Sequence, residues 1–162
     1  MTDSGQALDS IKESLKAVEL FSELNEDQLE RLAQIGEMQS HARGEVIFSQ
    51  GADGSHFHVV CSGSVRVSRT VPGIGEEAFA VLHRGSVFGE MSVFDDAPRS
   101  ADAIAHSKCD LFCVEKETLH RLFAHNRLLA CNVLGKLVRL LSRRLRESND
   151  KLSMLSVCAR FE

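Results

Sequence analysis

The sequence lacks long hydrophobic runs, paired cysteine motifs and an export signal, and each absence narrows the range of functions. No run approaches the roughly 18 apolar residues of a transmembrane helix, so no membrane span is predicted. Residues 1–16 are polar and hold no apolar signal core. The five cysteines are odd in number and show no CxxC spacing. We interpret them as reduced thiols of a cytoplasmic protein.

Positive charge is also scarce, because 19 Lys and Arg residues face 23 Asp and Glu residues and leave a net charge of −4. A mildly acidic chain is a poor candidate for non-specific binding to nucleic acid. The hydrophobic fraction of 43% and the mean hydropathy of −0.10 are those of an ordinary globular protein. A chain of 162 residues can bury one core, so we expect a single domain over residues 1–162.

Hydrophobic periodicity predicts helices in both end regions of the chain, residues 1–37 and 116–156. In the first region, residues 8–20 carry apolar side chains at steps of three and four, which indicates an amphipathic helix. Asn25 and Gln28 then have the spacing of a capping box, which predicts the start of a second helix.

The central region, residues 38–115, has the sequence pattern of short β-strands separated by glycine-rich turns. Short strands spaced by roughly 8–12 residues are typical of a β-sandwich, a jelly roll or a barrel. Because no helix-length segment separates most of them, a parallel α/β sheet is not expected, and the fold class is α+β. The strand-like runs are residues 46–48, 57–60, 65–67, 78–82 and 111–114.

The C-terminal region predicts a short helix over residues 116–125 and a long one over residues 127–156. The long helix carries two apolar stripes. We interpret one stripe as core-facing and the other, a heptad seam with one polar member, as a homodimer contact. The alternative is a single wide stripe that faces the core. The core-facing stripe is Leu129, Val133, Leu137 and Leu140; the seam is Cys131, Leu134, Val138, Leu141, Leu145, Ser148, Leu152 and Leu155.

The stretch FGEMSVFDDAPRSADAIA, residues 88–105, predicts a compact loop with an anion-binding end. Gly89 allows a sharp turn after a strand. Residues 90–94 can form a short helix whose free N–H groups attract an anion. Pro98 extends the chain just ahead of Arg99, whose planar guanidinium can point back at that anion.

Glu90 is the unexpected member of this loop, since a carboxylate repels a phosphate. Its position makes sense if it accepts a hydrogen bond from a neutral hydroxyl, such as that of a ribose, while Arg99 holds the charge and Ser100 adds a hydroxyl. A phosphate next to a sugar hydroxyl indicates a nucleotide. The alternative is a salt bridge between Glu90 and Arg99 that only pins the loop.

The same stretch resembles the phosphate-binding cassette of cyclic nucleotide-binding domains, the family of the bacterial catabolite activator and of the regulatory subunits of cyclic-nucleotide-dependent kinases. The resemblance covers residues 20–152: FSELNEDQLERLAQIGE is similar to the family's lead-in helices, and GEVIFSQGADGSHFHVVCSGSVRV to its glycine-punctuated hairpin. It implies an antiparallel, jelly-roll-like β-roll of eight strands, flanked by N-terminal helices and a long C-terminal dimerisation helix.

For the cassette, residues 88–101, the resemblance implies individual roles. Glu90 would take the ribose 2′-hydroxyl and Arg99 the cyclic phosphate, with Gly89 and Ser100 completing the cradle. In the long helix, SRRLRESNDKL resembles the family's adenine-contacting segment, and Ser148 and Asn149 correspond to a pair that approaches the base from two subunits. The alternative for these two is a solvated polar pair. The implied binding set in the cassette is Phe88, Gly89, Glu90, Met91, Ser92, Pro98, Arg99, Ser100 and Ala101.

Three features depart from the family's pattern. His58 stands where an aromatic residue is usual, and Asp102 where a Thr or a small residue is common. The family's activators carry a helix-turn-helix domain after the long helix, whereas this chain stops at Glu162. DNA binding by this chain alone is therefore not expected.

The resemblance implies a stand-alone bacterial sensor of cAMP, or as second choice cGMP. Such a sensor signals to an unknown effector protein. We expect no enzymatic activity, no further cofactor and no membrane contact. Two other readings are a purely structural dimerisation module and a cupin-like metalloprotein, which Gly51, His56 and His58 faintly suggest. The metal reading lacks the glutamate and the later histidine that a cupin site needs. We interpret the basic residues of the long helix as a solvated face: Lys136, Arg139, Arg143, Arg144 and Arg146.

Overall fold

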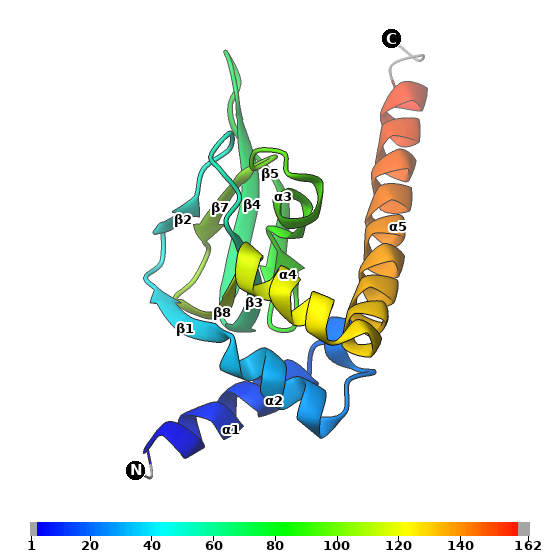
Figure 1. The fold of residues 1–162 in the computed structure, drawn as a ribbon. Coiled ribbons are helices and arrows are strands. Elements are labelled where there is room, and N and C mark those ends of the chain that lie inside the picture. The colour runs from blue at the N-terminus through cyan, green and yellow to red at the C-terminus, as the bar shows by residue number, and fades with distance from the viewer. Residues whose placement is uncertain (1–2, 159–162) are drawn as a thin grey trace.

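The protein's structure, a computed structural model, describes residues 3–158, with side chains from residue 7 to residue 154. Figure 1 shows two N-terminal helices at one end of a β-region and a long C-terminal helix along its side. No helix within the described part of the chain has the length and apolar character of a membrane span. The helices are α1 (Asp3–Lys16), the 3-10 helix η1 (Glu19–Phe21), α2 (Glu26–Gln34), α3 (Glu90–Asp95), α4 (Lys116–His125) and α5 (Arg127–Cys158).

The first helix ends earlier than the periodicity over residues 8–20 predicts. It ends at Lys16, and Val18 has extended backbone angles (φ −87°, ψ 122°) before η1 begins. Val18 is nevertheless buried in the core, so its apolar spacing reports burial rather than a continuous helix. The capping box is confirmed: Gln28 N donates to Asn25 Oδ1 at 2.9 Å, and Asn25 N donates to Gln28 Oε1 at 3.1 Å.

Among the residues that the structure describes, eight antiparallel strands form two four-stranded sheets, which confirms the α+β class and the jelly-roll-like β-roll. One sheet has the strand order β1-β8-β3-β6 and the other β2-β7-β4-β5. Each strand-like run of the sequence lies within one of these strands. They are β1 (Gly36–His41), β2 (Val46–Phe48), β3 (His56–Ser62), β4 (Ser64–Val71), β5 (Gly75–His83), β6 (Val87–Phe88), β7 (Asp102–Ala105) and β8 (Cys109–Glu115).

Strand β1 has no counterpart among the predicted runs. Its sequence, GEMQSH, contains one large apolar side chain, that of Met38, which is itself exposed. The strand lies at the edge of its sheet, where polar side chains face solvent. The alternation that identifies a half-buried strand is therefore missing.

The core has two parts, on either side of the sheet that contains β3 and β8. Phe112 and Val114 of β8 face the helices, in a cluster with buried residues of α1, α2 and α5. Leu111 and Cys113, which alternate with them, face the second sheet. The sheet therefore joins the helical layer to the interior of the roll.

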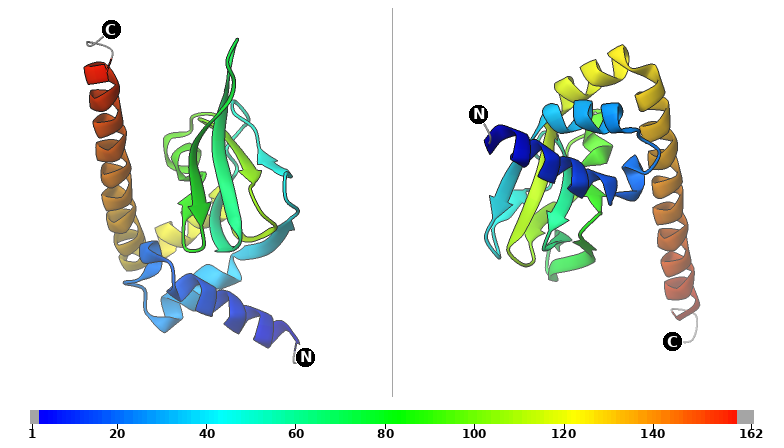
Figure 2. Two further views of the ribbon diagram at one scale, coloured as in Figure 1. Left: turned by 180° about the vertical axis from the view of Figure 1, so that it is seen from behind. Right: turned by 90° about the horizontal axis from the view of Figure 1, so that it is seen from below.

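Helix α5 enters the core through its N-terminal part. Leu129, Val133 and Leu137 are buried against the helical cluster, as the core-facing stripe predicts. Figure 2 shows from behind that the rest of α5 stands beside the roll and projects in the same direction as the β4–β5 hairpin. Leu145 of the seam is 61% exposed on this helix. The side chain of Leu155 lies outside the described residues.

The basic side chains of α5 are less solvated than the sequence suggests. Lys136 lies 3.1 Å from the carboxylate of Glu23, and Arg144 turns toward the roll and is half-buried. The prediction of a solvated face is wrong for these two residues. The physical reason is tertiary: the acidic N-terminal segment and the β-roll both pack against α5, which no local pattern reveals.

Candidate functional site

The cassette begins at a turn that only glycine can make without strain. Gly89 follows β6 with a left-handed backbone (φ 75°, ψ 4°) and precedes α3. A Cβ at this position would lie 2.5 Å from Arg99 Nη1 and 3.0 Å from the carbonyl oxygen of His56. Both the backbone angles and the close approach of the arginine therefore require glycine. At the far end of α3, the carboxylate of Asp96 pairs with Lys116 of α4.

Arg99 lies almost completely buried behind this turn, with 4% of the residue exposed. Its Nη1 donates to the carbonyl oxygen of Gly89 at 2.8 Å and its Nη2 to that of His56 at 2.7 Å. The guanidinium carbon lies 4.1 Å from the centre of the Phe48 ring, a favourable cation–π distance. Burial lowers the pKa of Arg99, and the negative charge of Glu90 opposes that shift.

Glu90, the first residue of α3, pairs with α5 and not with Arg99. Arg144 Nη1 donates to Glu90 Oε1 at 2.7 Å, and Arg144 Nη2 donates to the carbonyl oxygen of Val87 at 2.8 Å. The Glu90 side chain is only 5% exposed. Burial raises the pKa of Glu90, and the positive charges of Arg144 and Arg99 oppose that rise. The expected alternative, a Glu90–Arg99 salt bridge, is therefore not the contact that this loop makes.

A cavity of about 240 Å³ opens between the cassette and the β4–β5 hairpin. Its wall is apolar on the strand side, where Phe48, Val67, Ala80 and Leu82 line it. Arg144 of α5 closes the polar end beside Glu90 and Arg99. An anion and a hydroxyl could thus be held at one end while a flat apolar group lies on the strands. Eight residues of the predicted set line this cavity: Phe88, Gly89, Glu90, Met91, Ser92, Arg99, Ser100 and Ala101.

Three residues of the predicted set lie elsewhere in this structure. Pro98 lines a separate hollow beside Asp96, at the start of α4. Ser148 and Asn149 are exposed on α5 and are not among the residues that line the cavity. The structure therefore brings the cassette residues together but does not bring this pair to them.

Arg144 is the site residue that the sequence reasoning missed, since it was assigned to a solvated face. One signal could have found it. Arg144 precedes Ser148 by four residues, and residues four apart share one face of a helix. If Ser148 faces the ligand, Arg144 faces the same side one turn closer to the roll.

Two of the three departures from the family pattern, His58 and Asp102, have local structural roles. His58 is buried, and its ring stacks on that of Phe88 with centroids 4.8 Å apart. Burial, followed by the positive charge of Arg99, lowers the pKa of His58 to about 3, so the imidazole is neutral near pH 7. Asp102 accepts a hydrogen bond from Gln50 N at 2.8 Å. Within the described residues, no group of three or more His, Cys, Asp or Glu side chains is arranged to hold a metal ion.

Comparison with known proteins identifies the family. The profile of the cyclic nucleotide-binding domain matches residues 38–126, which include the cassette and seven complete strands of the roll. The chain therefore belongs to the cyclic nucleotide-binding domain family, and the resemblance inferred from the sequence is confirmed.

Individual relatives agree with this assignment. The cyclic AMP receptor protein of Thermus thermophilus is 35% identical over 142 residues, which are 88% of this chain and 64% of the relative. A cAMP-dependent protein kinase regulatory subunit of Mycosarcoma maydis is 31% identical over 83% of this chain and 24% of its own length. This chain thus spans less than two thirds of the length of these relatives, so the activities of the whole relatives are not assigned to it.

Solved structures give the same picture. The crystal structure of the Thermus thermophilus catabolite activator protein superposes with a TM-score of 0.74 at 36% identity, covering 85% of this chain and 63% of that one. A cyclic nucleotide-binding domain from Methylobacillus flagellatus reaches a TM-score of 0.78 at 27% identity, covering 90% and 82% of the two chains. The fold and the family are therefore supported independently.

Proposed function

We propose that the protein is a regulatory sensor of cyclic nucleotides, with cAMP as ligand and cGMP as second choice. The observation that carries the proposal is the placement of two buried charged groups, the Glu90 carboxylate and the Arg99 guanidinium, at one apolar-walled cavity. Arg99 Nε is buried and has no hydrogen-bond partner among the described residues, so it needs an acceptor that a ligand can supply. Similarity to a cyclic AMP receptor protein supports cAMP as the ligand, and similarity to a cGMP-dependent protein kinase of Drosophila melanogaster supports cGMP as the second choice.

In the proposed pose, the phosphate binds Arg99 and Ser100. Arg99 gives two N–H groups to backbone carbonyls, and a guanidinium has five, so donors remain for a phosphate. The ribose 2′-hydroxyl donates to Glu90. A carboxylate can accept about four hydrogen bonds, so Arg144 and a hydroxyl can share it. The purine lies on the apolar wall of β4 and β5.

The purine is also expected to reach toward α5. The cavity, at about 240 Å³, is smaller than the roughly 300–1,000 Å³ of typical ligand pockets, so the nucleotide extends beyond it. We propose that Ser148 and Asn149 meet the base there, across a homodimer formed by the seam of α5. The exposure of Val138 and Leu145 on this helix supports a partner contact.

The remaining organisation follows from this proposal. We propose that residues 1–162 form one cyclic nucleotide-binding domain, with helices over 1–37, the roll over 38–115 and C-terminal helices over 116–156. We propose a cytoplasmic bacterial regulator that passes its signal to an effector protein and catalyses no reaction itself.

Calorimetric titration of the purified chain with cAMP, cGMP and a cyclic dinucleotide tests the proposal. We expect one cAMP per chain, weaker cGMP binding and no binding of the dinucleotide. Arg99→Ala should weaken cAMP binding strongly, whereas Arg43→Ala, at an exposed arginine away from the cavity, should leave it unchanged. The absence of binding for all three nucleotides would refute the proposed function.

A further inference from the structure

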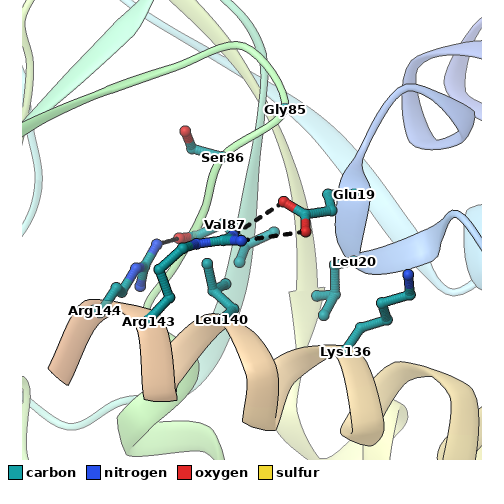
Figure 3. A pocket seen from close by; sticks show the side chains of 9 residues that line it. All are labelled: Glu19, Leu20, Gly85, Ser86, Val87, Lys136, Leu140, Arg143 and Arg144. Atoms are coloured by element: carbon teal, nitrogen blue, oxygen red, sulfur yellow. Dashed lines mark hydrogen bonds and ion pairs between the residues drawn. The ribbon is translucent and has the colours of Figure 1, made fainter. Parts of the chain in front are cut away.

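A second cavity lies where α5 passes η1 and the turn that leads into β6 (Figure 3). Its volume is about 160 Å³, close to the roughly 150 Å³ of an apolar protein cavity that takes up benzene. It is distinct from the cavity at the cassette, although Arg144 borders both. It is too small for a nucleotide and of a size for one ring or a short hydrocarbon.

The inner surface of this second cavity is apolar. Leu20 of η1 and Val87 of β6 are buried, and Leu140 of α5 packs against the helical cluster of the core. These three side chains line the cavity together. An apolar body placed there would remain in contact with hydrocarbon and leave water.

The rim of the second cavity holds the carboxylate of Glu19 against the guanidinium of Arg143, while the nearby Lys136 pairs with Glu23. Arg143 donates to both oxygens of Glu19, at 3.0 and 3.5 Å, as the dashed lines in Figure 3 show. Arg143, with a smaller contribution from Lys136, lowers the pKa of Glu19. The Glu19 side chain is 69% exposed, so its carboxylate reaches Arg143 from the solvent side. An exposed ion pair is weak, so another carboxylate can replace Glu19 on Arg143.

We propose that the second cavity binds a small organic carboxylate, with the ligand's carboxylate replacing Glu19 on Arg143 and its apolar body against Leu20 and Leu140. The side chain of Glu19 then acts as an internal stand-in for the ligand. This site uses none of the cassette's residues, so it goes beyond the proposed nucleotide function and does not depend on it.

Benzoate is the probe, followed by chemical-shift perturbation in the nucleotide-free protein. We expect saturable binding with a Kd on the order of 1–10 mM, as befits a ligand of this size. Acetate lacks the ring and benzamide lacks the charge, so both should bind at least about tenfold more weakly. Shifts should centre on η1, the turn before β6 and residues 136–144.

Three variants make the test specific. Glu19→Gln frees Arg143 and should tighten benzoate binding by about two- to fivefold, which a purely structural role of the Glu19–Arg143 pair does not predict. Arg143→Gln should weaken binding about tenfold or more, and Leu140→Phe should block it by filling the cavity. Arg146→Gln, an exposed arginine on the same helix, is the matched control and should change nothing.

Equal benzoate affinity in wild type, Glu19→Gln and Arg143→Gln would overturn the proposal, as would no saturable binding in wild type and Glu19→Gln. Thermal unfolding of each variant checks that it is folded. A protein that binds benzoate but not cAMP would keep this site and lose the proposed function, so the two failures are distinguishable.

Discussion

Replacing Arg144 by Gln should destabilise the protein because it leaves the Glu90 carboxylate buried without its cation. The pair joins a side chain that is 5% exposed to one that is 34% exposed, at 2.7 Å. A hydrogen bond to a charged group contributes about 1.5–3 kcal/mol, and solvent at Arg144 reduces this, so we expect a coupling energy of about 1–2 kcal/mol. The magnitude is large enough to measure in a domain of this size.

A double-mutant cycle with Glu90→Gln isolates that coupling. Urea unfolding of wild type, both single variants and the double variant gives the interaction term, at one fixed protein concentration because dimerisation would shift apparent stability. The Arg143–Glu19 pair, next along α5 and exposed, is the control and should couple by less than about 0.5 kcal/mol. A Glu90–Arg144 coupling below about 0.3 kcal/mol, as expected for independent sites, would refute the reasoning.

The pH dependence of the same variant has a defined sign. Burial raises the pKa of Glu90, so the folded state holds this proton more tightly than the unfolded chain does. This contribution favours folding below the unfolded pKa of about 4.3 and is lost as the pH rises through the folded pKa. Arg144 lowers the pKa of Glu90, so its removal raises the folded pKa further. The destabilisation by Arg144→Gln should therefore be large at pH 7 and shrink toward pH 4, where a protonated Glu90 needs no cation.

Three further outcomes are expected. Arg99→Ala should weaken cAMP binding by about 30-fold to several thousandfold in calorimetry, because loss of a desolvated charge pair costs roughly 2–5 kcal/mol. A change below threefold would contradict the proposed phosphate site. Glu90→Gln should weaken cAMP markedly and 2′-deoxy-cAMP hardly at all, and equal losses for the two ligands would remove Glu90 from the ribose. Leu145→Glu should give monomers in light scattering because it places like charges in the proposed seam, and a wild-type monomer at high micromolar concentration would exclude that seam.

Much of the fold could be predicted because its signals are local. The cap between Asn25 and Gln28, the glycine at position 89 and the helix over residues 116–125 each depend on neighbours within a few residues. The cassette is also local, since Glu90 and Arg99 are nine residues apart and one turn-helix-turn brings them to the same cavity. The most specific part of the family resemblance is this same short stretch.

The contacts of α5 could not be predicted in the same way, because they join residues far apart in sequence. Glu90 and Arg144 are separated by 54 residues, and nothing in the spacing of arginines along a helix says which of them meets a buried carboxylate. The polar edge strand β1 was missed for a related reason, since its pairing with β8 defines it as a strand and its side chains do not.

The arrangement of α5 also explains why adjacent arginines have different partners. Successive residues of a helix point about 100° apart. Arg143 therefore reaches Glu19 of the N-terminal segment, while Arg144 reaches Glu90 and the carbonyl oxygen of Val87. The buried stripe fixes the N-terminal part of α5, and these two arginines add contacts to the N-terminal segment and the roll farther along the helix. A ligand that hydrogen-bonds to Glu90 would share this acceptor with Arg144, so the proposed ribose contact and the contact between α5 and the cassette use the same carboxylate.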